Sequence, residues 1–145
     1  MKKAVIFDFK RTIYDPELDK LLPGIKGVLK QLKKRGYSLF LISHGSYPKA
    51  LIRKFELGPY FDEILITENK SSEDFKKIIS NNEIDTEISF VIGDRVRGEI
   101  KIGNSLGITT IWLRRGLFAE EFPLEPIEEP DFTIRSFREI LDCIS

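Results

Sequence analysis

The feature that most limits the fold of this chain is a regular alternation of short apolar runs with longer amphipathic segments. The runs are three to five residues long, rich in β-branched and aromatic types, and typical of buried strands. The segments between them carry apolar residues at helical spacing. Strands that alternate with helices in this way form βαβ units and a parallel sheet. We expect strands at residues 4–7, 38–42, 64–66, 88–92 and 109–113.

The segments between the strands carry the signals that begin and end helices. Pro23 and Gly24 open the first helix, and Ser71 or Ser72 can cap the third, with acidic residues in its first turn. Ser136 can cap the last one. We expect helices at about residues 24–34, 48–55, from 71 or 72 onward, 97–106 and 136–141.

Residues 116–131 have a different character from the rest of the chain. They contain three prolines and five glutamates. Proline removes a backbone donor and disfavours regular structure, so we predict a surface loop or flap here. A connection of this length is more often functional or mobile than a plain link. Residues 132–134 after it can add an edge strand to the sheet.

Composition limits the classes of protein that need to be considered. A chain of 145 residues predicts a single domain covering residues 1–145, and a net charge of zero argues against a non-specific nucleic-acid or membrane-surface binder. No apolar run is long enough to span a membrane. Cys143 is the only cysteine, so we expect no internal disulfide and a reducing, cytoplasmic location. The 32% of charged residues resembles the composition of proteins from hot environments.

Polar residues follow the ends of several predicted strands. Asp8 ends the first strand, Ser43 the second and Asp94 the fourth, while Lys70 lies in the loop after the third. In a parallel sheet with right-handed crossovers, all these strand ends meet at one edge, where open α/β sheets bind ligands. Each residue alone is explained by an ordinary turn or a surface position. Their joint arrival at one edge favours a functional site.

The chemistry of this set points to phosphoryl transfer. Two carboxylates at strand ends suit a hard divalent cation such as Mg²⁺, which prefers oxygen ligands. A metal ion, a lysine and a serine hydroxyl can together neutralise and hydrogen-bond a phosphoryl group. A carboxylate beside that group can attack phosphorus and form an aspartyl-phosphate.

Four ordered motifs carry a resemblance to a known family. The segments 7–12 (FDFKRT), 41–43 (LIS) and 93–94 (GD), together with Lys70 and Glu99, resemble the motifs of the haloacid dehalogenase superfamily. The resemblance covers nearly the whole chain. It implies a three-layer α/β sandwich with a Rossmann-like parallel sheet in the strand order 3-2-1-4-5. It also implies a Mg²⁺-dependent hydrolase that acts on a phosphorylated substrate.

The resemblance assigns catalytic and phosphate-binding roles residue by residue. Asp8 resembles the nucleophile, which is also a metal ligand. Ser43 resembles the hydroxyl that binds phosphate, and Lys70 resembles the lysine that steadies both nucleophile and phosphate. His44, the only histidine, stands beside Ser43, and we assign it to the substrate pocket or the turn.

The metal shell shows one departure from the family pattern. Asp94 resembles the acidic metal ligand, and Glu99 stands where a second acidic residue supports the shell. The family's second aspartate, two residues after the nucleophile, is Lys10 here. Its backbone carbonyl can still bind the metal. A lysine ammonium can donate a proton to the leaving group, but near neutral pH it cannot serve as the base.

Lys10 leaves two functions open. The first is a phosphoester hydrolase that is slow or unusual because the acid–base aspartate is missing. The second is a non-catalytic relative that binds metal, phosphate or a partner protein, with the Lys10 ammonium paired to Asp94 or Glu99 in place of the cation. A phosphoacceptor receiver domain also combines Asp, Ser and Lys, but its aspartate would follow the third strand, where Thr67 stands.

The resemblance also bears on the size of the substrate. Residues 14–22 are too few to form a cap domain of the kind that covers the site in many relatives. Relatives without a cap tend to act on large or extended substrates because the site stays open. The loop at residues 116–131 could shield the site in part.

Overall fold

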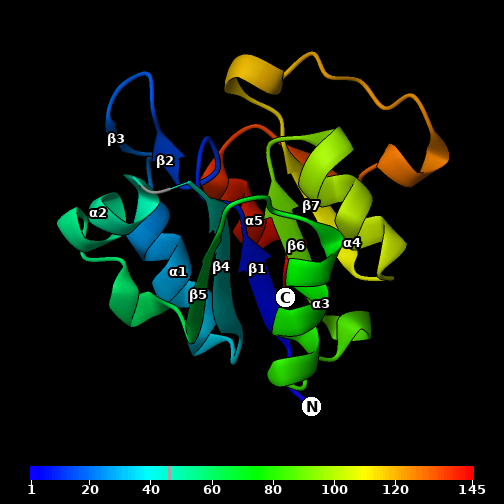
Figure 1. Cartoon of the computed structure of the whole chain (residues 1–145), viewed down its shortest axis with the longest axis horizontal. Coiled ribbons are helices and arrows are strands. Elements are labelled where there is room, and N and C mark those ends of the chain that lie inside the picture. Colours follow the sequence, from blue (N-terminus) through cyan, green and yellow to red (C-terminus); the bar gives the residue numbers. More distant parts are fainter. Residues whose placement is uncertain (46) are drawn as a thin grey trace.

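A six-stranded parallel sheet with helices on both faces is the frame of the molecule in the computed structural model, which describes residues 1–45 and 47–145 (Figure 1). The predicted strand order 3-2-1-4-5 is confirmed, and one further strand extends the sheet beyond the fifth. Across the sheet the strands are β5 (Glu63–Thr67), β4 (Ser38–His44), β1 (Ala4–Phe7), β6 (Phe90–Gly93), β7 (Thr109–Leu113) and β8 (Phe132–Ile134).

The pleat of the central strand β1 divides the apolar core into two layers. Val5 and Phe7 face one layer, which includes residues of α1 (Ile25–Lys34), α2 (Tyr47–Lys54) and α5 (Ile140–Cys143). Ala4 and Ile6 face the other layer, which includes residues of α3 (Ser72–Asn81) and α4 (Lys101–Ser105). Successive side chains of a strand point to opposite faces of its sheet, so one apolar run serves both layers. This arrangement confirms the predicted three-layer α/β fold.

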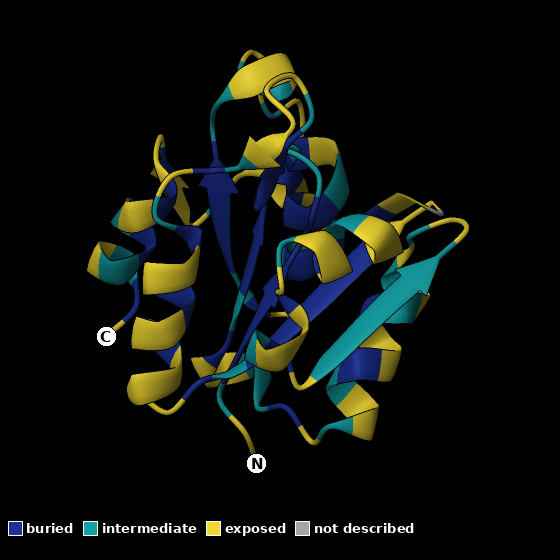
Figure 2. Cartoon of the chain, turned by 90° about the vertical axis from the view of Figure 1, so that its left-hand side faces the viewer, coloured by how far each residue is buried: buried dark blue, intermediate teal, exposed yellow. Residues whose placement is uncertain are grey.

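Burial follows the position of each strand in the sheet. All four residues of β1 are fully buried, because β4 and β6 pair with it on either side. The edge strand β5 is only half-buried along its length (Figure 2). The site described below lies at the carboxyl end of the most buried strand, where the backbone is held most firmly.

The segment between β1 and α1 forms a small hairpin that the sequence did not predict. Strands β2 (Tyr14–Asp15) and β3 (Lys20–Leu21) pair antiparallel. The Tyr14 ring stacks on Phe9 with 5.5 Å between ring centroids, and its hydroxyl donates to Asp19 Oδ1 at 2.5 Å. Each strand has only two residues, too few for a periodic pattern to be recognised.

Two predicted boundaries were wrong. The fourth strand begins at Phe90 and not at Ile88, because Thr86–Ile88 forms a 3₁₀ turn and the Ile88 side chain is exposed. The last helix is a 3₁₀ turn, Phe137–Glu139, followed by α5. Apolar runs at the ends of elements are ambiguous, and boundaries drawn from them shift by a few residues.

The helix predicted at residues 97–106 is divided into two parts. Val96–Ile100 is π-helical, and α4 follows it directly. Gly98 has φ −114° and ψ −106°, which is not helical and marks the kink. Wide turns of this kind occur often at functional sites, and this one carries Glu99.

The loop at residues 116–131 contains two 3₁₀ turns, Gly116–Phe118 and Pro126–Glu128. It is fastened to α4, because Asn104 Nδ2 donates to the carbonyls of Ile127 and Glu129 at 2.7 and 2.8 Å. The β2–β3 hairpin and the start of this loop rise above the same end of the sheet (Figure 1). Within the described ranges, no helix has the length and apolar character that crossing a bilayer requires.

Candidate active site

Three buried carboxylates meet at the carboxyl ends of β1 and β6. Asp8, Asp94 and Glu99 each offer one oxygen, and these oxygens lie within 4.8 Å of one another. The Asp8 amide donates to the carbonyl of Ile92 at 3.1 Å, which fastens the end of β1 to β6. The Trp112 indole donates to the carbonyl of Asp94 at 2.9 Å. Neighbouring strands thus hold the backbone of two of the three acidic residues.

Gly93 makes room for the third carboxylate. A Cβ atom at this position would lie 2.7 Å from Cβ and Cγ of Glu99, closer than such atoms approach in proteins. The Glu99 side chain therefore packs directly against the backbone at the end of β6. The non-helical backbone of Gly98 immediately precedes Glu99 in this turn.

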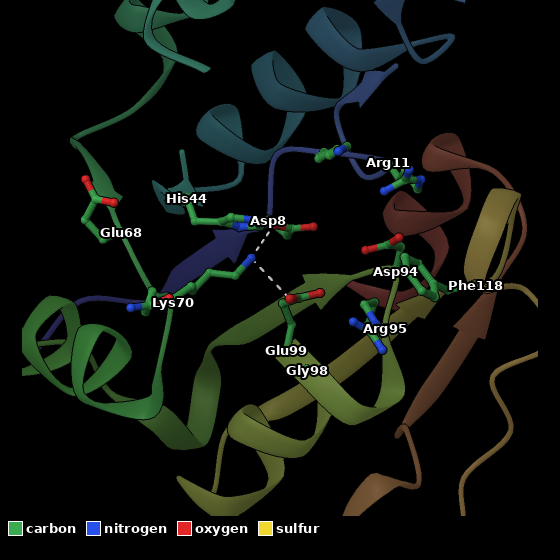
Figure 3. Close-up of a pocket in the computed structure, with 12 residues that line it drawn as sticks. Asp8, Arg11, His44, Glu68, Lys70, Asp94, Arg95, Gly98, Glu99 and Phe118 are labelled. Atoms are coloured by element: carbon green, nitrogen blue, oxygen red, sulfur yellow. Dashed lines mark hydrogen bonds and ion pairs between the residues drawn. The ribbon is translucent and has the colours of Figure 1, made fainter. Parts of the chain in front are cut away.

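The ammonium of Lys70 reaches into the carboxylate cluster from the loop after β5 (Figure 3). It donates to Oδ1 of Asp8 and lies 3.1 Å from Oε2 of Glu99. Burial alone would lower the pKa of Lys70, but the charges of Asp8 and Glu99 outweigh it and raise that pKa. Lys70 is therefore a fixed cation of the site.

The cluster carries more negative charge than Lys70 can balance. Burial, reinforced by the charges of Asp8 and Glu99, raises the pKa of Asp94 to about 8. Burial and the charge of Asp8 raise the pKa of Glu99 to about 6. In the part of the chain that the structure describes, Asp94 Oδ2 and Glu99 Oε1 are buried and have no hydrogen-bond partner.

These observations fit a divalent cation. When all three carboxylates are ionised, they and the one ammonium leave two negative charges, which is the charge that one divalent ion balances. Mg²⁺ prefers oxygen ligands, and the three carboxylates each offer one oxygen within 4.8 Å of the other two. The donor set present in the chain is therefore able to hold such a metal ion.

Lys10 does not join the carboxylates. Its ammonium lies 5.7 Å from the centroid of the Tyr47 ring, and in residues 1–45 and 47–145 it forms no ion pair with Asp94 or Glu99. The arrangement in which Lys10 replaces the cation is therefore not found. Lys10 nevertheless lines the same cavity as the cluster. The prediction that its carbonyl binds the metal stays a prediction.

Ser43 and His44, at the end of β4, differ in their access to the site. His44 is exposed and lines the cavity. Ser43 is buried, pairs in register with Ile66, and is not one of the described residues that line the cavity. The predicted phosphate-binding role of Ser43 stays a prediction, and His44 is the more accessible of the two.

The cavity above the cluster has a volume of about 420 Å³ and contains residues that the sequence did not single out. Glu68 and Asn69 come from the loop that carries Lys70. Arg11, Arg95 and Phe118 line it as well. Arg11 lies within the motif at residues 7–12 and Arg95 directly follows Asp94, and these positions are the sequence signals that could have found them. Phe118 comes from the long loop, for which length alone suggested a function.

The chain belongs to the family described as haloacid dehalogenase-like hydrolases, whose model matches residues 2–113. Its curated relatives include a glyceraldehyde 3-phosphate phosphatase of Pyrococcus furiosus, 28% identical over 85% of this chain. A pyrimidine 5′-nucleotidase of Streptococcus pneumoniae is 25% identical, also over 85% of this chain. The match covers 54% of each relative, so the chain spans about half their length.

Solved structures agree on the fold. A phosphatase structure from Clostridium difficile superposes with a TM-score of 0.86 over 99% of both chains, at 17% identity. A phosphatase structure from Thermococcus onnurineus gives a TM-score of 0.80 over 97% of both chains, at 15% identity. At this level of identity, these likenesses show the fold alone. Members of this family generally use a divalent metal, and the carboxylate cluster could hold one.

Proposed function

We propose that this protein is a Mg²⁺-dependent phosphoester hydrolase. The observation that carries the proposal is the cluster of Asp8, Asp94 and Glu99 beside the ammonium of Lys70, which has two negative charges in excess when all three carboxylates are ionised. The phosphatase names of the curated relatives support it. Asp8, Asp94, Glu99 and the backbone carbonyl of Lys10 would hold the ion, which would neutralise charge on the transferring phosphoryl group.

In the proposed reaction, a carboxylate oxygen of Asp8 attacks phosphorus, and the bond from phosphorus to the ester oxygen breaks. The alcohol leaves with a proton, and an aspartyl-phosphate stays on the protein. Water then attacks this phosphorus, which releases inorganic phosphate and regenerates the Asp8 carboxylate. Lys70 holds Asp8 in position and offers positive charge to the phosphoryl oxygens, while Ser43 and His44 complete the phosphate side.

The group that transfers protons is the unusual part of this proposal. The side chain that follows Asp8 by two positions is Lys10, which can protonate the leaving alcohol but cannot readily activate water. Loss of general acid–base help costs about 10²- to 10⁴-fold in rate. We therefore infer a slow hydrolase. We also infer a single domain with an open site, suited to an extended substrate, because only the short β2–β3 hairpin stands between β1 and α1.

A second function has one observation in its favour. Lys70 already pairs with both Asp8 and Glu99, and a cluster held together by a lysine is stable without turnover. A non-catalytic protein that binds metal, phosphate or a partner protein could use the same cluster. In that case Asp8 would never carry a phosphoryl group.

The test is hydrolysis of p-nitrophenyl phosphate with Mg²⁺, Mn²⁺, Co²⁺ or no metal. Asp8→Asn keeps the shape of the side chain but removes the attacking charge, so turnover should disappear. Asp62→Asn is the matched control, since Asp62 is exposed and lies at the amino end of β5, whereas the site lies at the carboxyl ends of the strands. Activity that survives in Asp8→Asn would reject the nucleophile. Metal binding without turnover in the unaltered protein would favour the non-catalytic function.

A further inference from the structure

Two arginines and a phenylalanine form one wall of the cavity, on the side away from Glu68 and Lys70 (Figure 3). The guanidinium carbon of Arg11 lies 5.5 Å from the centroid of the Phe118 ring, and that of Arg95 lies 4.1 Å from it. A guanidinium over an aromatic ring is attracted by the ring's quadrupole. Three segments distant in sequence thereby bring two guanidiniums together beside the carboxylate cluster.

The positive charges of the two arginines are not equally compensated. Arg95 is 2.6 Å from Oε2 of Glu121, whose side chain is 7% exposed, so a buried carboxylate balances it. The partner of Arg11 is Glu17 at 3.5 Å, whose side chain is 61% exposed and therefore screened by water. The Arg11 side chain itself is only 16% exposed. Arg11 is thus a largely buried cation with a weak counter-charge.

Arg11 also has an unused donor and an unusual backbone. Within the described residues, its Nε atom is buried and has no hydrogen-bond partner, as is also the case for Nε of Arg95. A buried guanidinium donor without an acceptor costs free energy. An anionic group bound in the cavity would supply the missing acceptor. The backbone of Arg11 has φ +64°, a left-handed conformation that side chains rarely adopt, and its amide donates to the carbonyl of Tyr14 at 2.7 Å. Strain of this kind is kept mainly at functional positions.

We propose that Arg11, supported by Arg95 and Phe118, forms a subsite for a second anionic group, so that the substrate is a phosphate monoester that also carries a carboxylate or a second phosphate. This proposal rests on the proposed hydrolase function. The cavity volume of about 420 Å³ is in the range of small-molecule sites, so it has room beyond a single phosphoryl group. The carboxylate cluster would take the reacting phosphate, and Arg11 would take the other anion as a forked donor.

The three residues have different roles in this subsite. Arg11 contacts the substrate and determines specificity. Phe118 and Arg95 act as positioning residues, because the ring receives both guanidiniums and Glu121 anchors Arg95. A nucleobase stacked on Phe118 is the competing occupant. We favour the anion because two cations already approach that ring.

The test compares substrates that differ in one group. 3-Phosphoglycerate and glycerol 3-phosphate share a three-carbon skeleton, and only the first carries a carboxylate. Fructose 1,6-bisphosphate and fructose 6-phosphate share the same sugar, and only the first carries a second phosphate. The expected result is a higher kcat/KM for the substrate with the second anion in at least one pair. The pair that shows this difference tells whether the second anion is a carboxylate or a phosphate. UMP, which has a base but no second anionic group, should be poorer.

The preference is the kcat/KM for the substrate with the second anion divided by the kcat/KM for its partner without it. The variant Arg11→Gln should lower this ratio by about one to two orders of magnitude, the loss expected for one charge-assisted contact. Arg11→Lys should restore part of it, since the charge returns without the fork. Arg115→Gln is the matched control, because Arg115 lies 4.0 Å from Asp15 and does not line this cavity. A ratio that Arg11→Gln leaves unchanged would overturn the proposal, as would UMP as the best substrate.

A separate measurement distinguishes failure of the subsite from failure of the hydrolase. If the unaltered protein does not hydrolyse even p-nitrophenyl phosphate, the hydrolase function fails and kinetics say nothing about Arg11. Calorimetric titration with 3-phosphoglycerate, glycerol 3-phosphate and both fructose phosphates then tests the subsite directly. Tighter binding of a second-anion compound that is lost in Arg11→Gln supports the subsite. Equal binding within both pairs overturns it.

Discussion

The ammonium of Lys70 lies 3.1 Å from Oε2 of Glu99 and donates at the same time to Asp8. The lysine comes from the loop after β5, and the glutamate from the π-helical turn after β6. This contact joins the two sides of the cavity across β1. Burial and the charges of Asp8 and Glu99 raise the pKa of Asp94 further than that of Glu99, whose carboxylate pairs directly with Lys70.

Removal of Lys70 should destabilise the fold strongly. Lys70→Met leaves three buried carboxylates without their cation, and breaking a buried pair from one side costs about 3–5 kcal/mol. Urea unfolding at neutral pH measures this loss, and added Mg²⁺ should restore part of the stability because it supplies positive charge. Lys76→Met is the control, since its pair with Glu73 is exposed and contributes little. Equal losses in the two variants would contradict this account of the cluster.

The stability of the metal-free protein should fall as pH rises from about 4 to about 8. Asp94 and Glu99 have folded-state pKa values of about 8 and about 6, above their ordinary values of 3.8 and 4.5. The folded state therefore binds more protons than the unfolded state in this window, and its stabilisation is lost as those protons leave. Lys70 stays protonated throughout and adds nothing to the slope, because its pKa is raised.

Chemical unfolding between pH 5 and pH 8 measures this slope. Asp94→Asn should flatten it, because the group with the larger shift no longer titrates. Saturating Mg²⁺ should reverse its sign, since a cation binds the deprotonated carboxylates and so competes with protons. A metal-free protein whose stability rises steadily from pH 5 to pH 8 would show that the carboxylates are not held as the structure describes.

Gly93→Ala should disrupt the carboxylate cluster. The new methyl group would overlap Glu99, whose Cβ and Cγ lie 2.7 Å from that position, and would push the side chain away from Asp8 and Asp94. We expect weaker Mg²⁺ binding in calorimetry together with lower stability, by about 1–3 kcal/mol for an overpacked site.

Gly27→Ala provides the comparison for this substitution. Gly27 lies on the exposed face of α1, and a Cβ atom there would meet nothing within 4 Å. Alanine favours a helix interior over glycine, so this variant should be more stable by about 0.5–1 kcal/mol and bind Mg²⁺ as before. Similar losses of metal binding in both glycine variants would reject the steric explanation.

The fold could be predicted because its signals are local. The apolar runs at residues 4–7 and 109–113 matched β1 and β7 without correction, and the strand order followed from the family resemblance. Errors arose where a structure depends on distant contacts. The β2–β3 hairpin is held by packing of Tyr14 on Phe9 and by the bond from Tyr14 to Asp19, which no periodic pattern reveals.

The juxtaposition of the carboxylates and Lys70 could be predicted from the sequence, but the cavity wall that contains Phe118 could not. Asp8, Asp94 and Lys70 come together because parallel strands deliver their ends and the loops after them to one edge, whereas Glu99, in the turn after β6, was placed by the family resemblance. The wall around Phe118 depends on how the loop at residues 116–131 folds back, and its composition carries no signal for that path. The direction of the Lys10 side chain was also beyond the sequence, because Tyr47 lies on another element.

Lys10→Asp should raise phosphatase activity by about 10²- to 10⁴-fold. If the cluster already positions phosphate and nucleophile, the missing component is a group that gives a proton to the leaving alcohol and takes one from water. An aspartate at position 10 supplies that group. It also replaces a positive charge in the cavity by a negative one, which should tighten Mg²⁺ binding. Steady-state kinetics and calorimetry measure the two effects separately.

Two controls separate the acid–base effect from the change of charge. Lys10→Met removes the ammonium and its contact with the Tyr47 ring, 5.7 Å away, but supplies no carboxylate. Lys49→Asp makes the same charge reversal on the exposed face of α2. Only Lys10→Asp should gain turnover. If instead activity falls in both Lys10 variants and the pH–rate profile loses one limb, Lys10 is itself the acid–base group. If the unaltered protein and Lys10→Asp are both inert although Mg²⁺ binds, position 10 is not the defect, and the non-catalytic binding function replaces the hydrolase.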